Sequence, residues 1–171
     1  MIRRRVLRPC GTRAEAAFSP CGAYRYALTL RWGSGPRLAW IMLNPSRADA
    51  ARNDPTVERC ERRARAMGYG AMRVVNLFAI RATRPADMKC APDPVGPGGD
   101  AALAAALRWA DDAICGWGVH GAHRGRDREV RARLRRPLVL GLTAGGHPRH
   151  PLYVPYAAAP LPWLDAAARA A

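Results

Sequence analysis

The chain has 171 residues, enough to bury one full hydrophobic core, and its apolar content of 49% argues against a disordered protein. Its 28 basic and 13 acidic residues give a formal net charge of +15, which favours a polyanionic partner such as nucleic acid or a nucleotide. A solvated basic surface is the alternative interpretation of this charge. No apolar run approaches the roughly 18 residues that a membrane helix needs, so we expect no membrane partner.

Residues 1–19 are rich in arginine and lack periodicity, which predicts an extended basic arm. No apolar stretch follows its first arginines, so we expect no secretory signal and a cytoplasmic protein. Residues 24–32 have the pattern of a strand, and the glycine-rich segment 33–36 has that of a turn. A buried apolar strand is predicted over residues 38–43. The two strands and their turn together predict a β-hairpin near the N-terminus.

The remainder of the chain alternates between helical and apolar segments. Asp54 followed by Pro55 predicts the N-cap of a helix that runs to about Met67. Further helices are predicted at 100–109 and 124–136, and further strands at 72–77, 113–117 and 137–142. This alternation predicts a three-layer α/β/α fold with a mainly parallel central sheet of about four strands, to which the N-terminal hairpin adds a strand.

The chain shows no internal repeat and no linker of domain scale, so we expect a single α/β domain over residues 1–171 that acts as a monomer. Five cysteines are scattered without a C-x-x-C pair, which predicts neither a disulfide framework nor a metal site. We also expect no cofactor. The sequence contains no G-x-x-x-x-G-K-[ST] loop, no G-x-S-x-G elbow and no H-E-x-x-H motif, which disfavours several common enzyme classes.

Polar residues follow three of the predicted strands. Asn44 and Ser46 follow the strand at 38–43, Asn76 lies at the end of the next strand, and His147 and His150 follow the last one. Ligands of open α/β sheets bind beyond the carboxyl ends of the strands. We therefore predict one polar site for a nucleobase-like ligand. The alternatives are that the asparagines are turn or bridging residues and that the histidines are solvated.

Three short motifs carry a resemblance to the uracil-DNA glycosylase superfamily. Residues 42–46 (Met-Leu-Asn-Pro-Ser) resemble its Asn-Pro-Gly loop, and residues 74–77 (Val-Val-Asn-Leu) resemble the strand that ends in a base-reading asparagine. Residues 146–151 (Gly-His-Pro-Arg-His-Pro) look like its last, His-Pro-containing loop. The resemblance covers about residues 38–155 and implies a uracil-DNA-glycosylase-like fold and a role in DNA repair.

This chain departs from that superfamily in two respects. Ser46 stands where the superfamily has glycine, and no aromatic residue lies between Asn44 and Tyr69, where an aromatic side chain usually stacks under the base. A base other than uracil is therefore expected.

A second resemblance is to an uncharacterised bacterial family, the domain of unknown function 1643. Residues 40–49, 53–56 and 76–78 look like the signature of that family, and so do residues 147–153. This resemblance covers nearly the whole chain from Ser19. It implies relatives but supplies no reaction.

The glycosylase resemblance implies a role for each candidate residue. Asn44 would position a water beneath the sugar, and His147 or His150 would donate an N–H to the departing base. Asn76 would read a base edge, since its amide offers a donor and an acceptor together. The other candidates for base binding are Ser46, Asp54 and Phe78. Asp54 has the alternative role of a helix cap. The candidates for phosphate contacts are Arg128, Arg131, Arg135 and Arg149.

Three functions remain open at this point. The leading hypothesis is a glycosylase-like enzyme that hydrolyses the N-glycosidic bond of a damaged, mismatched or modified base in nucleic acid, with DNA favoured over RNA. A base within a duplex would have to be flipped out first. The alternatives are a noncatalytic nucleic-acid-binding module, and an enzyme that modifies a nucleotide or base in the same pocket.

Overall fold

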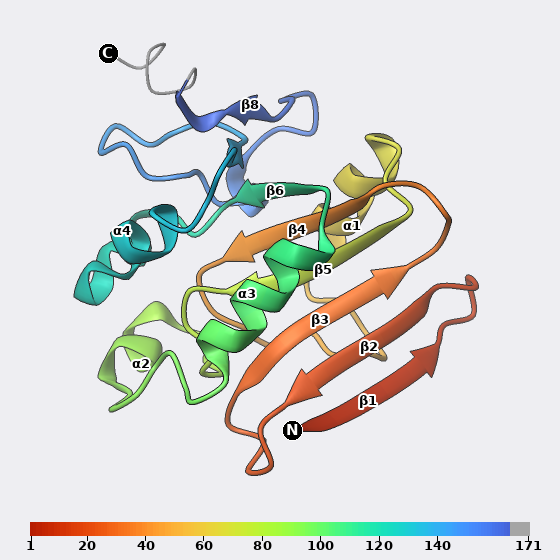
Figure 1. The fold of residues 1–171 in the computed structure, drawn as a ribbon, viewed down its shortest axis with the longest axis horizontal. Coiled ribbons are helices and arrows are strands. Elements are labelled where there is room, and N and C mark those ends of the chain that lie inside the picture. Colours follow the sequence, from red (N-terminus) through yellow and green to blue (C-terminus); the bar gives the residue numbers. More distant parts are fainter. Residues whose placement is uncertain (165–171) are drawn as a thin grey trace.

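The computed structural model describes residues 1–164 and is built on an eight-stranded sheet with the order β1-β2-β3-β5-β4-β6-β7-β8 (Figure 1). The strands are β1 (Ile2–Leu7), β2 (Arg13–Phe18), β3 (Arg25–Arg31), β4 (Arg37–Met42), β5 (Ala71–Asn76), β6 (Asp112–Cys115), β7 (Leu138–Val139) and β8 (Leu161–Pro162). The helices are α1 (Pro55–Ala66), α2 (Pro85–Cys90), α3 (Gly99–Trp109) and α4 (Arg126–Arg131), and the 3-10 helices are η1 (Val119–Gly125) and η2 (Pro151–Tyr153).

The sheet is mixed. The pairs β1/β2, β2/β3, β3/β5 and β7/β8 are antiparallel, whereas β5/β4, β4/β6 and β6/β7 are parallel. The prediction of a mainly parallel sheet of about four strands with a uracil-DNA-glycosylase-like fold is therefore wrong. The last seven residues of the predicted domain, 165–171, lie outside the described part of the chain.

The segment expected to form an extended basic arm forms β1 and β2, which pair antiparallel from Ile2↔Phe18 to Leu7↔Arg13. All six residues of β1 are exposed, because β1 is the edge strand of the sheet. An exposed edge strand shows no apolar alternation, and its arginines suit an edge that must resist pairing with other chains. These features explain why the sequence pattern did not indicate a strand.

The predicted hairpin between β3 and β4 is also wrong, because β5 lies between these two strands. Val74 of β5 pairs antiparallel with Leu28 on one side and parallel with Trp40 on the other. The chain crosses over from β4 through α1 and returns as β5, which takes the position next to β4. The glycine-rich segment after β3 therefore connects two strands that are not neighbours.

Helices cover both faces of the sheet (Figure 1). Val57, Cys60 and Ala64 of α1 belong to the core on one face, which also contains Trp40. Their spacing of three and four residues puts them on one side of the helix. The other face carries α2, α3 and α4, whose apolar side chains pack with Ile41 and other residues of the second core. No helix within residues 1–164 is long and apolar enough to cross a membrane.

The basic segment predicted as a helix over 124–136 is shorter in the structure. It consists of the end of η1 and the six-residue helix α4. Arg124 has a positive φ of 55°, and Gly125 also lies in the left-handed region, so the chain kinks before α4 begins. Arg126 is buried and forms ion pairs with Asp100 and Glu129, both at 2.6–2.8 Å.

Candidate functional site

A cavity of about 780 Å³ lies where the parallel strands β5, β4, β6 and β7 end. This volume is in the range of sites that bind small molecules and cofactors. The loops after these strands form its wall together with the start of α1 and η2. Six of the residues predicted from the sequence line it: Asn44, Ser46, Asp54, Asn76, Arg149 and His150.

Asn44 follows β4, and its amide nitrogen is held by the backbone. Asn44 Nδ2 donates to the carbonyl oxygens of Ala82 at 2.7 Å and Pro45 at 3.1 Å. These two bonds fix the orientation of the side chain. Within the described chain, Asn44 Oδ1 has no hydrogen-bond partner, so this oxygen is free to accept a hydrogen bond from a ligand or a water.

Asn76 is the last residue of β5 and is only 5% exposed. Its Oδ1 is buried and has no hydrogen-bond partner among residues 1–164. A buried acceptor without a partner costs about 1–3 kcal/mol, so such atoms are uncommon in native proteins. A ligand donor in the cavity would satisfy this oxygen.

His150 immediately precedes η2, and its Nδ1 accepts a hydrogen bond from the backbone N–H of Leu152 at 3.3 Å. The proton of the neutral ring therefore lies on Nε2. Burial lowers the pKa of His150 below its usual value of 6.5, while the charge of Asp54 acts in the opposite direction. At neutral pH His150 is consequently a neutral ring with one N–H donor.

Asp54 caps α1 through one carboxylate oxygen and holds the preceding loop through the other. Oδ1 accepts from the N–H of Val57 at 2.9 Å, and Oδ2 accepts from the N–H of Ala48 at 3.3 Å. The helix-cap role is thus present in the structure. Each oxygen thus accepts one backbone hydrogen bond, which holds Asp54 in place at the wall of the cavity.

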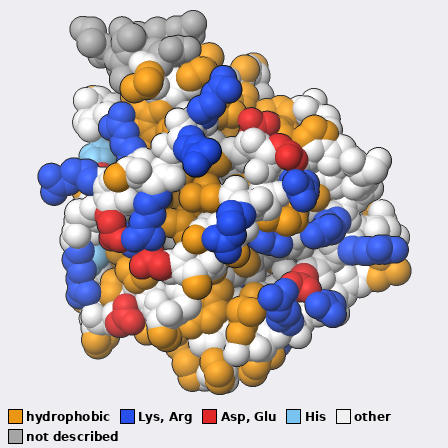
Figure 2. Space-filling view, in the orientation of Figure 1, with side chains coloured by type: hydrophobic (Ala, Val, Ile, Leu, Met, Phe, Trp, Pro, Cys, Tyr) orange, Lys and Arg blue, Asp and Glu red, His pale blue; other side chains and the backbone are white. Residues whose placement is uncertain are grey.

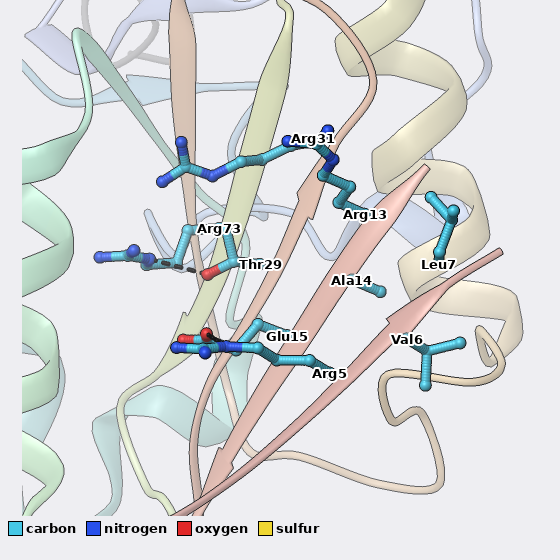
Figure 3. Close-up of a pocket in the computed structure, with 9 residues that line it drawn as sticks. All are labelled: Arg5, Val6, Leu7, Arg13, Ala14, Glu15, Thr29, Arg31 and Arg73. Atoms are coloured by element: carbon cyan, nitrogen blue, oxygen red, sulfur yellow. Dashed lines mark hydrogen bonds and ion pairs between the residues drawn. The ribbon is translucent and has the colours of Figure 1, made fainter. Parts of the chain in front are cut away.

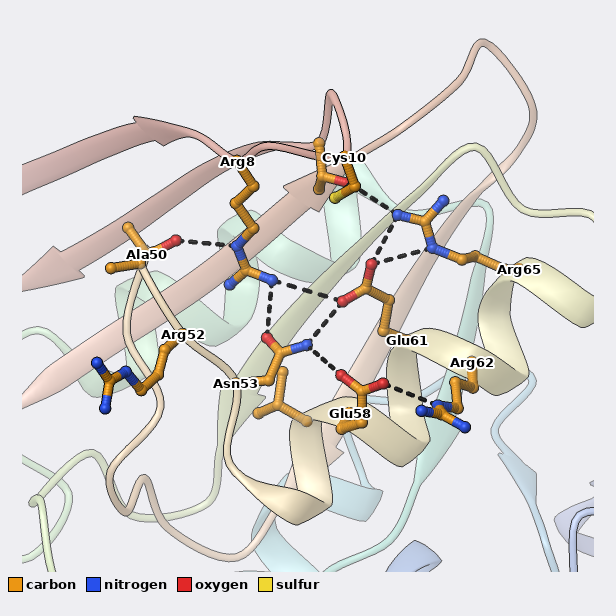
Figure 4. A network of polar contacts seen from close by, with 12 residues as sticks. Arg8, Cys10, Ala50, Arg52, Asn53, Glu58, Glu61, Arg62 and Arg65 are labelled. Carbon is orange, nitrogen blue, oxygen red and sulfur yellow. Dashed lines mark hydrogen bonds and ion pairs between the residues drawn. The ribbon is translucent and has the colours of Figure 1, made fainter.

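A polar network fixes the loop between β4 and α1 from its outer side (Figure 4). Arg8, from the β1–β2 turn, donates to the carbonyl oxygen of Ala50 and to Asn53 Oδ1, both at 3.0 Å. Asn53 Nδ2 then donates to the carboxylates of Glu58 and Glu61 at 2.9 and 2.7 Å. The N-terminal hairpin therefore helps to position the loop that carries Ala48 and Asp54.

The structure separates the two candidate histidines. His147 Nδ1 lies 3.6 Å from Asp127 Oδ2, and the backbone N–H of His147 donates to Thr143 Oγ1 at 3.2 Å. His147 does not line the cavity, whereas His150 does. Phe78 does not line it either, because it is fully buried and packs against His123 with ring centroids 5.7 Å apart.

Other residues of the cavity were not predicted as site residues, among them Trp117, His120, Arg47 and Arg25. Trp117 and His120 follow β6, the one parallel strand whose end was not considered, so the same reasoning about strand ends would have found them. Arg47 adjoins the predicted Asn-Pro-Ser segment. Arg25 comes from β3, and no local pattern in the sequence places it at this edge.

The open face of β1, β2 and β3 forms a second, different surface. It contains a groove of about 400 Å³ whose side chains include Arg5, Glu15, Arg31 and Arg73 (Figure 3). Figure 2 shows arginines spread over this part of the molecule. Arg73 lies 4.4 Å from the ring centroid of Trp109, and Arg31 lies 5.6 Å from it. Glu15 forms ion pairs with arginines of β1 at 2.5–2.6 Å.

No group of three or more His, Cys, Asp or Glu side chains that could hold a metal ion occurs in the part of the chain that the structure describes. The Arg128, Arg131 and Arg135 side chains are exposed and lie outside the cavity. They remain accessible to a partner on the side of α4.

The fold and the site define a mixed-sheet protein with a cavity at the carboxyl ends of its parallel strands. Residues 25–152 match the family described as protein of unknown function DUF1643, and the chain belongs to this family. No curated protein and no solved structure matches the chain. The resemblance to uracil-DNA glycosylases is not supported by these comparisons.

Proposed function

We propose that the cavity binds a nucleobase and that the protein hydrolyses the N-glycosidic bond of a damaged, mismatched or modified base in nucleic acid. The observation that carries this proposal is the convergence of Asn44, Asn76 and His150 from three strand ends on one cavity. The three side chains offer complementary groups: a free amide oxygen, a buried acceptor and a neutral N–H donor.

These groups suit the charges of glycosidic bond cleavage. As the bond between the sugar carbon and the base nitrogen breaks, its electron pair leaves with the base and positive charge develops on the sugar. A water that donates a hydrogen bond to Asn44 Oδ1 adds to the sugar carbon and releases one proton. The departing base takes up one proton, so the overall reaction is balanced. The Nε2–H of His150 would stabilise the negative charge on that base, as preorganised donors do. Asn76 would bind the base edge.

The proposed partner is nucleic acid, with DNA favoured over RNA. The net charge of +15 supports a polyanionic partner. Arg47 and Arg149 are exposed at the cavity, so they could contact phosphates beside a base that enters it. Arg128, Arg131 and Arg135 are proposed as further phosphate contacts. A cytoplasmic location and a monomeric state stay predictions.

The exposed aromatic Tyr153 offers a group that the sequence motif lacks. Its ring lies at the cavity with its centroid 5.7 Å from that of His150. A base held near His150 would therefore find an aromatic surface from η2 rather than from the loop after β4.

The test is a panel of labelled oligonucleotides that carry uracil, hypoxanthine, xanthine, and oxidised or alkylated bases. Wild-type protein is expected to create abasic sites in at least one of them, and Asn44→Ala is expected to retain binding while turnover falls. Arg62→Met, on the exposed side of α1, is the control. If no base is released from any oligonucleotide, nucleoside or nucleotide, a noncatalytic module or a base-modifying enzyme replaces the proposal.

A further inference from the structure

Arg25 reaches the cavity because of an irregularity in the sheet. Phe18 of β2 pairs with Arg25 and Ala17 pairs with Ala27, so Tyr26 is an extra residue between the two pairs. Paired residues share a face of the sheet, and Phe18 belongs to the core under α1. The bulge therefore turns Arg25 toward α1 and the cavity. Bulges often re-aim side chains in this way beside functional sites.

The guanidinium of Arg25 is poorly satisfied when it is compared with that of Arg63. Both residues are buried, with exposed fractions of 2% and 4%. Arg63 donates through its two terminal nitrogens to four backbone carbonyls, those of Val154, Pro155, Tyr156 and Ala158. Arg25 donates to one carbonyl, that of Ala48. The Nε of each arginine is buried without a partner among residues 1–164, so the difference lies in the terminal nitrogens.

No carboxylate pairs directly with Arg25 within residues 1–164. Asp54 is nearby, but its oxygens accept the N–H groups of Val57 and Ala48. Burial lowers the pKa of Arg25 to about 10, a shift that the charges of Asp54 and Asp49 reduce and that of Arg81 increases. A buried cation without a paired anion is costly, so most such groups in proteins meet a counter-charge.

We infer that Arg25 is the anion-binding residue of this cavity and that the ligand carries a phosphate group. Arg47 and Arg149 line the same cavity and add positive charge, and the unpartnered Oδ1 of Asn76 offers a contact for a base. Together these groups fit a nucleoside phosphate. The inference rests on the cavity of the proposed function, but it does not require that the glycosidic bond is cleaved.

The test measures affinity and thermal stability with inorganic phosphate, the four ribonucleoside 5′-monophosphates, the matching nucleosides and a short single-stranded oligonucleotide. Wild-type protein is expected to bind the monophosphates more tightly than the nucleosides, with a rise in Tm. Arg25→Met is expected to weaken monophosphate binding by about 10- to 100-fold, the usual effect of losing a charged hydrogen-bond donor. Arg25→Lys keeps the positive charge but lacks the planar guanidinium, so this variant should recover part of the affinity for the monophosphate.

Arg63→Met is the matched control for a buried arginine, and Arg62→Met is the control for surface charge. Arg63→Met is expected to lower the Tm of the unliganded protein and to keep the rise caused by the monophosphate. Arg25→Met is expected to leave the unliganded Tm unchanged or higher, because an apolar residue replaces an unpaired buried charge. If Arg25→Met instead lowers the unliganded Tm as Arg63→Met does and binds the monophosphate like wild type, Arg25 is a structural residue.

The probes also separate the two sources of phosphate. Tighter binding of a monophosphate than of the oligonucleotide identifies a free nucleotide, and the reverse order identifies a phosphodiester of nucleic acid. Equal binding of nucleosides and monophosphates by wild-type protein would overturn the inference. Base release is assayed independently, so a protein that binds phosphate through Arg25 but releases no base refutes the proposed function and retains the anion site.

Discussion

The parallel and the antiparallel parts of the sheet present their polar residues in different ways. The parallel strands β5, β4, β6 and β7 all end at one edge, so residues as distant as Asn44 and His150 meet at one cavity. The antiparallel strands β1, β2 and β3 end at alternate edges and gather no such loops. Their arginines, such as Arg31, instead spread over an open face. The excess of positive charge is thus found both at a cavity formed by strand-end loops in one part and along a groove on an open sheet face in the other.

The largest expected effect concerns the concave site. His150→Ala should slow base release by about 100-fold or more, because one donor to developing negative charge has an effect of this size. His147→Ala should remain close to wild type, since His147 lies outside the cavity. Single-turnover measurement of abasic-site formation compares the two variants. If both variants released the base equally slowly, the position of His150 at the cavity would not explain its role in the reaction.

Asn76→Leu should separate ligand binding from stability. The substitution removes a buried acceptor that has no partner, so the unliganded protein should be as stable as wild type or more stable. The affinity for a base should fall by about 10-fold, since the ligand loses a hydrogen bond in a buried site. Denaturant unfolding and equilibrium binding measure the two quantities. A large loss of stability would show that Asn76 is a structural residue of the strand end.

Two triple variants compare the two basic surfaces. Replacing Arg128, Arg131 and Arg135 with Ala should make nucleic-acid binding less dependent on salt, by about 0.9 in the logarithmic slope for each lost phosphate contact. We expect this because α4 lies beside the cavity loops, where Asp127 contacts His147.

The matching change of Arg13, Arg31 and Arg73 to Ala on the open sheet face should leave that slope unchanged. Arg31 and Arg73 already lie against Trp109. If the second triple variant lowers the slope and the first does not, the open face is the nucleic-acid surface.

The smallest expected effect is a pH dependence of stability at His150. Its pKa is lower in the folded protein than the usual 6.5, so the unfolded chain takes up a proton first as the pH falls. The free energy of unfolding should therefore decrease as the pH falls below about 6.5, down to the folded-state pKa. His123 has a lowered pKa as well, so the comparison is made between wild type and His150→Gln. The variant should show the weaker decrease below pH 6.5.

The sequence predicted those residues of the site that follow the parallel strands. Asn44 and Asn76 could be predicted because each ends an apolar run, and strands of that kind share one edge. Arg25 could not, because its side chain reaches the cavity only through the bulge at Tyr26, which reverses the alternation expected for β3. Phe78 was misjudged for a related reason: it follows Asn76 and Leu77, but the chain turns it into the core under α3.

The positions of individual strands along the chain could be predicted, but the order of the strands in the sheet could not. Strand β4 lies within one residue of the apolar run that predicted it, whereas its separation from β3 depends on where β5 returns. The position of β5 depends on pairing between distant segments, and Val57 and Ala64 of α1 lie in one core with residues of all three strands. Such long-range pairing is invisible to a local pattern. The same limit hid β1, which pairs with no strand except β2 within residues 1–164.

Arg8, which contacts the loop before α1, lies outside the segment that matches the family. The match to the family begins at Arg25, which is the first residue of β3. A fragment cut there would lack Arg8, so the backbone around Ala50 would lose its anchor, and β3 would become an unprotected edge strand open to pairing with other chains. The family match therefore begins inside the sheet, after the hairpin that anchors the loop before α1.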